Sequence, residues 1–317
     1  MKLLISIFSI LLIGKTSYAQ LTEIYIGTTQ VNLAYNRDSD KSTYIPDSAN
    51  PDIALFHFAK TGNTWKNIYD IDSFDLKYFR LNNFGVFFRG KKIGSNAAVL
   101  DTSMYRIPWF EYPYHLKNPK LPRIGNRSIE FAGEFGYKFY RPLLFSNSQC
   151  CKKINNIRYR KATGADKIQL QNFLISEAEK LALGKIPDNH KIVEKVTKVL
   201  AINDSCKIVV ANINLNMYCY SQKIPFDSTE TDDTRIWFSE EAQAIAYTKK
   251  TPDCYFLITK HSALYIGHSM KLLDYADFDN DGYDEIIFRQ DIGDNYAGYV
   301  MISNKLTEVF ESGWSFH

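Results

Sequence analysis

Residues 273–288 of this 317-residue chain read LDYADFDNDGYDEIIF, an acidic segment with an apolar run at each end. Alternate residues of a tight loop can point toward a common centre, and Gly282 at the sixth loop position permits the sharp turn that this requires. The apolar ends predict two β-strands joined by the loop. Acidic side chains stand at the first, third, fifth and ninth loop positions, which are Asp277, Asp279, Asp281 and Glu285.

This loop predicts a calcium site. Calcium is a hard cation that takes about six to eight oxygen ligands, and the carboxylates supply such oxygens. The backbone carbonyl of Tyr283, at the seventh position, is expected to face the ion, whereas Asp284 is expected to point outward. Magnesium fits less well because it retains its waters, and zinc would favour His or Cys, which the loop lacks. The alternative without a metal is a solvated acidic Asp-Gly turn.

The segment also resembles a known repeat. An EF-hand fits poorly, because its twelfth position would be Phe288 instead of a bidentate glutamate. Residues 271–303 instead resemble the calcium loop of FG-GAP/VCBS-type repeats, as found in integrin-like β-propellers. The sequence holds one clear copy; residues 70–75 could be a degraded second copy that lacks the glycine. The resemblance implies that the loop joins two strands of a blade and that the calcium ligands are Asp277, Asp279, Asp281, the Tyr283 carbonyl and Glu285.

Residues 1–19 have the pattern of a secretory signal peptide. Lys2 supplies a positive start, residues 3–13 are almost entirely apolar, and Ser17 and Ala19 suit cleavage before Gln20. As a helix the apolar run would cover about 16 Å, too short for a hydrocarbon core of roughly 30 Å. We therefore expect a secreted or periplasmic protein with no transmembrane segment after cleavage.

Export would place the five cysteines under oxidising conditions, so disulfides are expected. The number is odd, so at least one cysteine is free or paired between chains. In a continuous strand, Cys206 and Cys219 would lie about 43 Å apart, far beyond the roughly 7 Å limit for bridged Cα atoms. Cys254, which opens another strand-like run, is the better partner for Cys219.

The composition favours a mainly β protein, because 15% of the residues are aromatic and aromatic side chains suit pleated sheets. We predict a β-rich region over 20–161, a helical insertion over 162–200 and a second β-rich region over 201–317 that carries the calcium loop. The expected architecture is propeller-like, with two packed β-sandwich domains as the alternative. Short apolar runs predict strands at 23–26, 53–58, 84–88, 97–100, 235–238, 244–248, 255–259, 263–266, 285–288 and 299–303.

Within the insertion, residues 166–183 are expected to form a helix because their apolar side chains recur at helical spacing. Asp166 followed by Gln169 fits a capping-box-like start. Residues 191–200 fit a second helix or, because of their β-branched content, a strand. From Lys207 the apolar period changes to two, which predicts a half-buried strand with a polar outer face.

The sequence lacks the common catalytic motifs, such as HExxH, Gly-x-Ser-x-Gly and a phosphate-binding glycine loop. The first functional hypothesis is therefore a non-enzymatic binding or surface-interaction module with an unknown protein or glycan ligand. A secreted polysaccharide-acting hydrolase, with the aromatic loop 109–114 as a sugar platform, is an alternative. A further alternative is an anionic-polymer binder using residues 117–161, which hold eleven Lys and Arg against two Glu. Nucleic acid is not an expected partner of an exported protein.

Overall fold

The computed structural model describes residues 24–36, 43–46, 53–68, 84–96, 99–101, 105–107, 110–112, 115–117, 129–132, 137–148, 152–181, 192–213, 253–292, 296–303 and 305–313. In these residues the fold is mainly β with a helical insertion, α3 (Gly164–Leu181), as the sequence predicted. Several expectations fall outside the described residues. They concern the signal peptide, residues 70–75, Trp109, Cys150, Cys151, Cys219 and the strands predicted at 235–238 and 244–248.

The first half of the chain forms a ten-stranded antiparallel sheet, which we call the N-terminal sheet. Its main path runs β6-β5-β12-β1-β3-β10-β7, and β1 pairs with β12 on one side and with β3 on the other. A separate hairpin consists of β8 (Tyr105–Ile107) and β9 (Phe110–Tyr112). The strands of the sheet are β1 (Ile24–Asn36), β2 (Thr43–Pro46), β3 (Ile53–Thr61), β4 (Thr64–Asn67), β5 (Phe84–Phe88), β6 (Lys91–Asn96), β7 (Val99–Asp101), β10 (His115–Lys117), β11 (Ile129–Ala132) and β12 (Tyr137–Ser146).

Two smaller antiparallel sheets follow in the chain. The helix-backed sheet has the order β13-β14-β15-β16-β17, and the C-terminal sheet has the order β18-β19-β20-β21. The former contains β13 (Arg158–Arg160), β14 (Val193–Asn203), β15 (Cys206–Ile213), β16 (Cys254–Ile258) and β17 (Ala263–His268). The latter contains β18 (Met270–Ala276), β19 (Glu285–Ile292), β20 (Tyr296–Ser303) and β21 (Glu308–Gly313).

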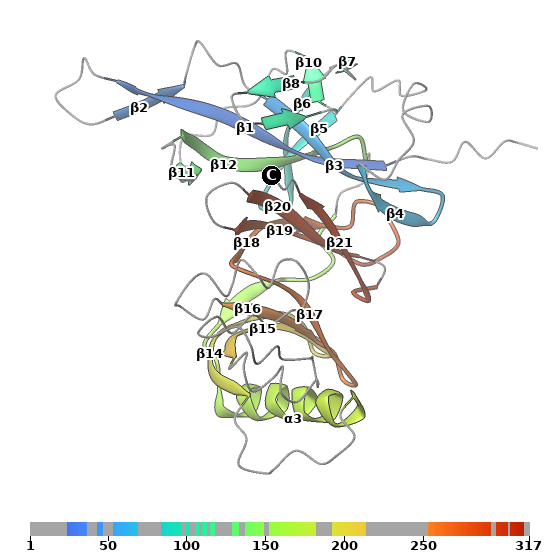
Figure 1. Ribbon diagram of the computed structural model, residues 1–317. Helices are drawn as coiled ribbons and strands as arrows, with labels where there is room; N and C mark the ends of the chain where they lie inside the picture. The colour runs from blue at the N-terminus through green and yellow to red at the C-terminus, as the bar shows by residue number, and fades with distance from the viewer. Residues whose placement is uncertain are drawn as a thin grey trace, which may run out of the picture.

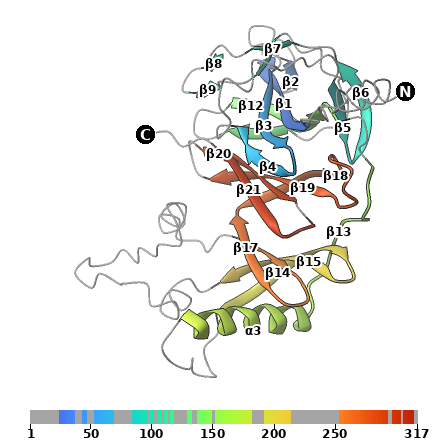
Figure 2. The same cartoon turned by 90° about the vertical axis from the view of Figure 1, so that its right-hand side faces the viewer.

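These elements stack in layers, with the C-terminal sheet between the other two sheets and α3 on the outer face of the helix-backed sheet (Figures 1 and 2). Leu170 and Leu174 of α3 pack on that outer face. Its inner face meets the C-terminal sheet in a second apolar cluster, which includes Ile208 and Phe288. A third cluster joins the C-terminal sheet to the N-terminal sheet. The loop between β18 and β19 therefore belongs to the central layer.

The helix start differs from the prediction. Helix α3 begins at Gly164, and Thr163 is the residue before its first turn. The Thr163 amide donates to Asp166 Oδ2 at 2.9 Å, while the Asp166 amide contacts Thr163 Oγ1 at 3.4 Å. This reciprocal pair is a capping box, so Asp166 is its third-position acid and not its first residue. The predicted pairing of Asp166 with Gln169 was wrong, because Thr163 supplies the cap three residues before the start of the predicted helix.

The helical insertion is shorter than predicted, because the second part of residues 162–200 forms strand β14 from Val193 onward. Its β-branched side chains suit the pleated sheet. The predicted polar outer face of the strand after Lys207 was wrong for residues 208–211, which are buried on both sides. The reason is the stacking, since Val209 packs toward α3 while Val210 packs toward the C-terminal sheet.

Other strand predictions are confirmed, including those that became β1, β3, β5, β7, β16, β17, β19 and β20. The C-terminal sheet is a four-stranded meander, with each strand paired to the next along the chain. Propeller blades have this strand order. Among the described residues, this meander is the part that carries the predicted calcium loop.

Two cysteines lie in the described residues, and both are free, buried thiols. Burial raises the pKa of Cys206 to about 11 and that of Cys254 to about 12, so both remain uncharged near neutral pH. The predicted pairing of Cys254 with Cys219 stays a prediction. No helix in the described part of the chain has both the length and the apolarity needed to cross a bilayer.

Candidate metal centre

The predicted ion loop connects β18 to β19, and its own side chains hold its backbone in place. Asp277 Oδ1 and Asp279 Oδ1 each accept the amide of Asp281 at 3.1 Å, and Asp277 Oδ2 accepts the amide of Gly282 at 3.1 Å. Asn280 and Gly282 have left-handed backbone angles, with φ of 59° and 89°. Asparagine and glycine tolerate this region best, which explains why they stand at these positions.

Three of the predicted ligands come together. Asp277, Asp279 and Glu285 each offer a carboxylate oxygen, and these oxygens all lie within 4.8 Å of one another. Asp281 does not join them, because its Oδ1 accepts the amide of Tyr283 at 2.9 Å at the exposed end of the loop. The structure thus brings together the first, third and ninth loop positions, while the fifth position faces its own turn.

The prediction that Asp284 points outward was wrong. Its side chain is fully buried and accepts the amides of Ile154 at 2.9 Å and Asn155 at 2.8 Å. The segment that leads from the N-terminal sheet to β13 passes beside the loop, where the Lys152 carbonyl accepts the amide of Asp277 at 3.0 Å. Asp284 therefore fastens this passing segment to the start of β19 and is unavailable to an ion on the other side.

The N-terminal sheet also reaches the loop. Lys60, at the end of β3, places its Nζ 2.5 Å from Asp279 Oδ2. Trp65 of β4 donates its indole N–H to the same oxygen at 3.2 Å. Sequence reasoning missed both residues, which lie more than 200 positions before Asp279 and carry no motif of their own. A cation thus already contacts the carboxylate cluster.

The cluster lies in a poorly solvated place that disfavours negative charge. Burial, followed by the charge of Asp279, raises the pKa of Glu285 to about 9. Glu285 accepts the Phe278 amide at 2.7 Å and the Ser303 hydroxyl at 2.8 Å, which fixes both of its oxygens. Burial also raises the pKa of Asp277. A bound cation would favour the ionised forms; with all three carboxylates ionised, the cluster and the Lys60 ammonium would sum to −3 + 1 = −2, the charge that a divalent cation neutralises.

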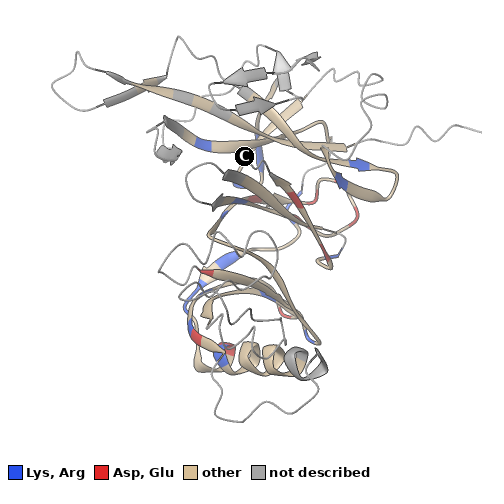
Figure 3. Cartoon of the chain, in the orientation of Figure 1, with Lys and Arg blue, Asp and Glu red and all other residues tan. Residues whose placement is uncertain are grey.

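Cations of the basic segment 117–161 hold the same hairpin. Arg141 of β12 donates to the carbonyl of Leu272, and the Lys153 Nζ lies 3.8 Å above the ring of Tyr275. In the same strand, Asp274 Oδ2 accepts the amide of Gly90 at 2.8 Å. Figure 3 shows Lys and Arg on all three sheets, and Asp and Glu on the C-terminal and helix-backed sheets. These contacts make the β18–β19 hairpin the junction at which separate parts of the chain meet.

The donor set of the cluster fits a hard cation. All three gathered side chains offer carboxylate oxygens, and neither sulfur nor imidazole is among them. The Lys60 ammonium on Asp279 shows that this position stabilises positive charge. The donor set by itself does not distinguish calcium from other hard cations.

Comparison of the chain with family models, with curated proteins and with solved structures finds no match. The likeness to FG-GAP/VCBS-type repeats therefore rests on the loop residues and stays a hypothesis. The hydrolase and anionic-polymer alternatives depend on residues 109–114 and 117–161, which lie partly outside the described residues, and they too stay predictions.

Proposed function

We propose that this chain is an exported calcium-binding protein, a non-enzymatic binding or surface-interaction module whose ion stiffens the junction between the C-terminal and N-terminal sheets. The observation that carries the proposal is the convergence of Asp277, Asp279 and Glu285 beside Lys60. The FG-GAP/VCBS-type resemblance adds Asp281 and the Tyr283 carbonyl as ligands. The partner would be a protein or a glycan, bound by a surface that the ion holds in shape.

Calcium suits this loop better than magnesium because of the number of protein oxygens on offer. Calcium accepts carboxylates in flexible geometry, whereas magnesium demands a near-ideal octahedron and keeps several waters. Burial of Glu285 further favours a cation that is bound directly by side chains. An ion held at this place would bind the folded chain and not the unfolded one, and so it would raise stability.

Calcium is expected to bind the mature chain at a ratio near one and to raise its melting temperature. Calcium at a hundred times its dissociation constant would add about 2.7 kcal/mol to the free energy of unfolding. Asp279→Asn removes one ligand charge and should weaken binding at least about tenfold, a loss of about 1.4 kcal/mol. Isothermal titration calorimetry and thermal unfolding, each with and without chelator, measure both effects.

The matched control is Asp204→Asn in the exposed turn between β14 and β15, which should bind calcium as the wild type does. Magnesium at the same concentration should give a smaller rise in melting temperature. Equal melting temperatures in calcium and in chelator would refute the proposed function.

Lys60→Met is expected to strengthen calcium binding. The ammonium now shares Asp279 Oδ2 with any incoming ion, so its removal takes away a competing positive charge. We expect about a tenfold lower dissociation constant, equivalent to about 1.4 kcal/mol. Lys66→Met, an exposed lysine of β4, is the control and should leave the affinity unchanged. An unaltered affinity in Lys60→Met would mean that Asp279 is not a ligand.

A further inference from the structure

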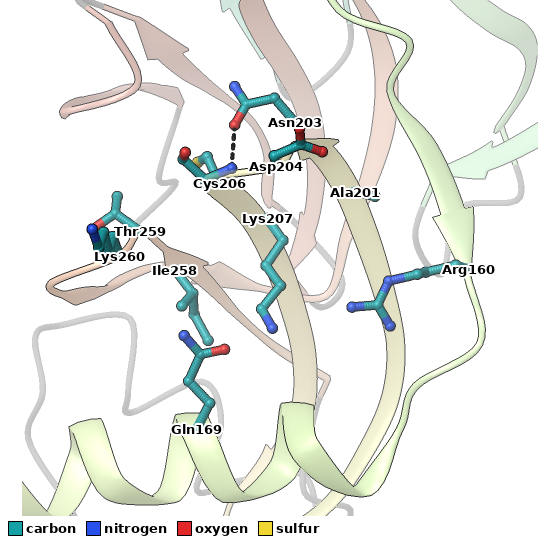
Figure 4. A pocket seen from close by; sticks show the side chains of 11 residues that line it. Arg160, Gln169, Ala201, Asn203, Asp204, Cys206, Lys207, Ile258, Thr259 and Lys260 are labelled. Carbon is teal, nitrogen blue, oxygen red and sulfur yellow. Dashed lines mark hydrogen bonds between the residues drawn. The ribbon is translucent and has the colours of Figure 1, made fainter.

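A cavity of about 490 Å³ lies on the helix side of the molecule, away from the ion loop. Four segments surround it. They are β13 at Arg160, α3 at Gln169, the turn between β14 and β15, and the turn between β16 and β17 (Figure 4). Figure 4 shows the amide of Gln169 rising from the helix toward the cavity and the side chain of Lys207 reaching down toward the same space. The volume falls in the range of pockets that hold small molecules.

The charges around this cavity are unbalanced. Arg160, Lys207 and Lys260 line it, and they come from three separate segments of the chain. The lining contains one carboxylate, that of Asp204, which lies in an exposed turn. The cavity wall therefore carries three positive charges against one negative charge.

A buried carboxylate behind the wall holds two of these cations in place. Asp166 is 1% exposed and does not line the cavity. It binds the guanidinium of Arg160 through two bonds of 2.8 Å and the ammonium of Lys207 at 2.7 Å. One carboxylate against two cations leaves a local charge of +2 − 1 = +1. The cations are thus fixed before any ligand arrives, which lowers the entropy cost of binding.

The cations held by Asp166 retain N–H groups that can donate hydrogen bonds to a ligand. An ammonium has three N–H groups, and the contact of Lys207 with Asp166 uses one of them. The amide of Gln169 adds a neutral donor at the cavity. Cys206 also lines the cavity and adds no charge, because burial raises its thiol pKa. Positive charge and directed donors around one half-open cavity are the chemistry that recognises an anionic group.

We propose that this cavity binds a small organic anion, a sugar-sized molecule that carries one carboxylate or phosphate group. The anionic group would lie near Lys207 and Arg160, and Lys260 would close the outer side. This site is independent of the proposed calcium loop, since it uses α3 and the helix-backed sheet, and its failure would leave the calcium proposal intact.

The test titrates the mature chain with glucuronate, glucose 6-phosphate and glucose at low ionic strength, using calorimetry or NMR line shifts. Saturable binding is expected for at least one of the two anions and not for glucose. A preference between the anions assigns the carboxylate or the phosphate. Binding should weaken as salt rises from about 20 mM to about 500 mM, because the attraction is electrostatic.

Lys260→Gln should weaken anion binding about three- to fivefold. Because Lys260 is exposed, the substitution should not impair folding. Lys305→Gln, in an exposed turn of the C-terminal sheet, is the matched control and should bind as the wild type does. Lys207→Gln, with its fold checked by circular dichroism, should weaken binding further. Absence of saturable binding of either anion, equal binding of glucose, or unchanged affinity in both Lys260→Gln and folded Lys207→Gln would overturn the proposal.

Discussion

Replacement of Asp166 by alanine is expected to lower the free energy of unfolding by about 3 kcal/mol. The side chain is 1% exposed and performs two tasks at once. It closes the capping box with Thr163 at the start of α3, and it forms ion pairs with Arg160 and Lys207. The loss of a cap costs about 1 kcal/mol. Two unpaired cations add about 2 kcal/mol, less than in a dry core because both remain partly solvated.

Chemical denaturation at neutral pH measures this loss. Asp166→Asn keeps the size and one acceptor oxygen but removes the charge, so it should fall between alanine and the wild type. Asp204→Ala, in the exposed turn of the same sheet, should change stability by less than about 0.5 kcal/mol. The hydrogen bond from Arg160 holds the pKa of Asp166 well below its usual range, so its contribution is present near neutrality and is lost in strong acid. A stability change below about 1 kcal/mol for Asp166→Ala would contradict this account.

The second large effect is acid sensitivity caused by His57. This residue of β3 is buried where the N-terminal sheet meets the C-terminal sheet. Its ring stacks on Tyr299 with centroids 3.9 Å apart, and its Nε2 lies 2.7 Å from Thr28 Oγ1. Its Nδ1 lies 3.5 Å from the hydroxyl of Ser312. These partners carry no charge near neutral pH, so they provide no counter-ion for an imidazolium, and burial lowers the pKa of His57 to about 3.

The sign of the pH effect follows from proton binding. Below about pH 6.5 the unfolded chain takes up a proton on His57 while the folded chain does not. Each pH unit then removes about 1.4 kcal/mol, and the loss ends near the folded pKa of about 3. The total is about 5 kcal/mol. Above about pH 6.5 both states are neutral at this residue, and the penalty disappears.

Urea unfolding from about pH 7.5 to about pH 5 measures this slope above the range in which most carboxylates titrate. Relative to His57→Gln, the wild type should lose about 2 kcal/mol over that interval. Glu285, whose raised pKa acts in the opposite direction, is present in both chains and cancels from this difference. His57→Gln cannot titrate at this position, so its stability should be lower at pH 7.5 but should lack the acid-induced loss that His57 causes. His261→Gln, at an exposed turn, is the control and should retain the wild-type slope. A wild-type slope in His57→Gln would show that another group causes the acid sensitivity.

The sequence predicted the local elements better than their assembly. Apolar runs located strands such as β3 and β19, and helical spacing located α3, because these signals lie within a few adjacent residues. The outer face of the strand after Lys207 is buried at Ile208 and Val210, contrary to the prediction, because burial on both sides depends on which sheets stack. Periodicity within a single strand cannot reveal a second layer when its residues come from 60 to 90 positions away.

In the candidate site, too, the sequence predicted the local loop but not the contacts that other sheets make with it. The loop spacing identified Asp277, Asp279 and Glu285, since their approach depends on the loop alone. It did not identify Lys60 or Trp65, which reach Asp279 only because the N-terminal sheet packs beside the C-terminal sheet. Asp284 was assigned outward because the segment at Ile154 is invisible in the loop sequence. Contacts made across sheets were therefore the part that sequence reasoning missed.

The position of the C-terminal sheet has a consequence for biosynthesis. This sheet lies between two layers built from earlier parts of the chain, and its strands are synthesised after both of them. Until residues 270–313 emerge, the inward surfaces of both earlier layers lack their cover and expose apolar side chains to water. A chain truncated before residue 270 would leave both surfaces uncovered, so it should fold as poorly as a chain truncated within either earlier layer.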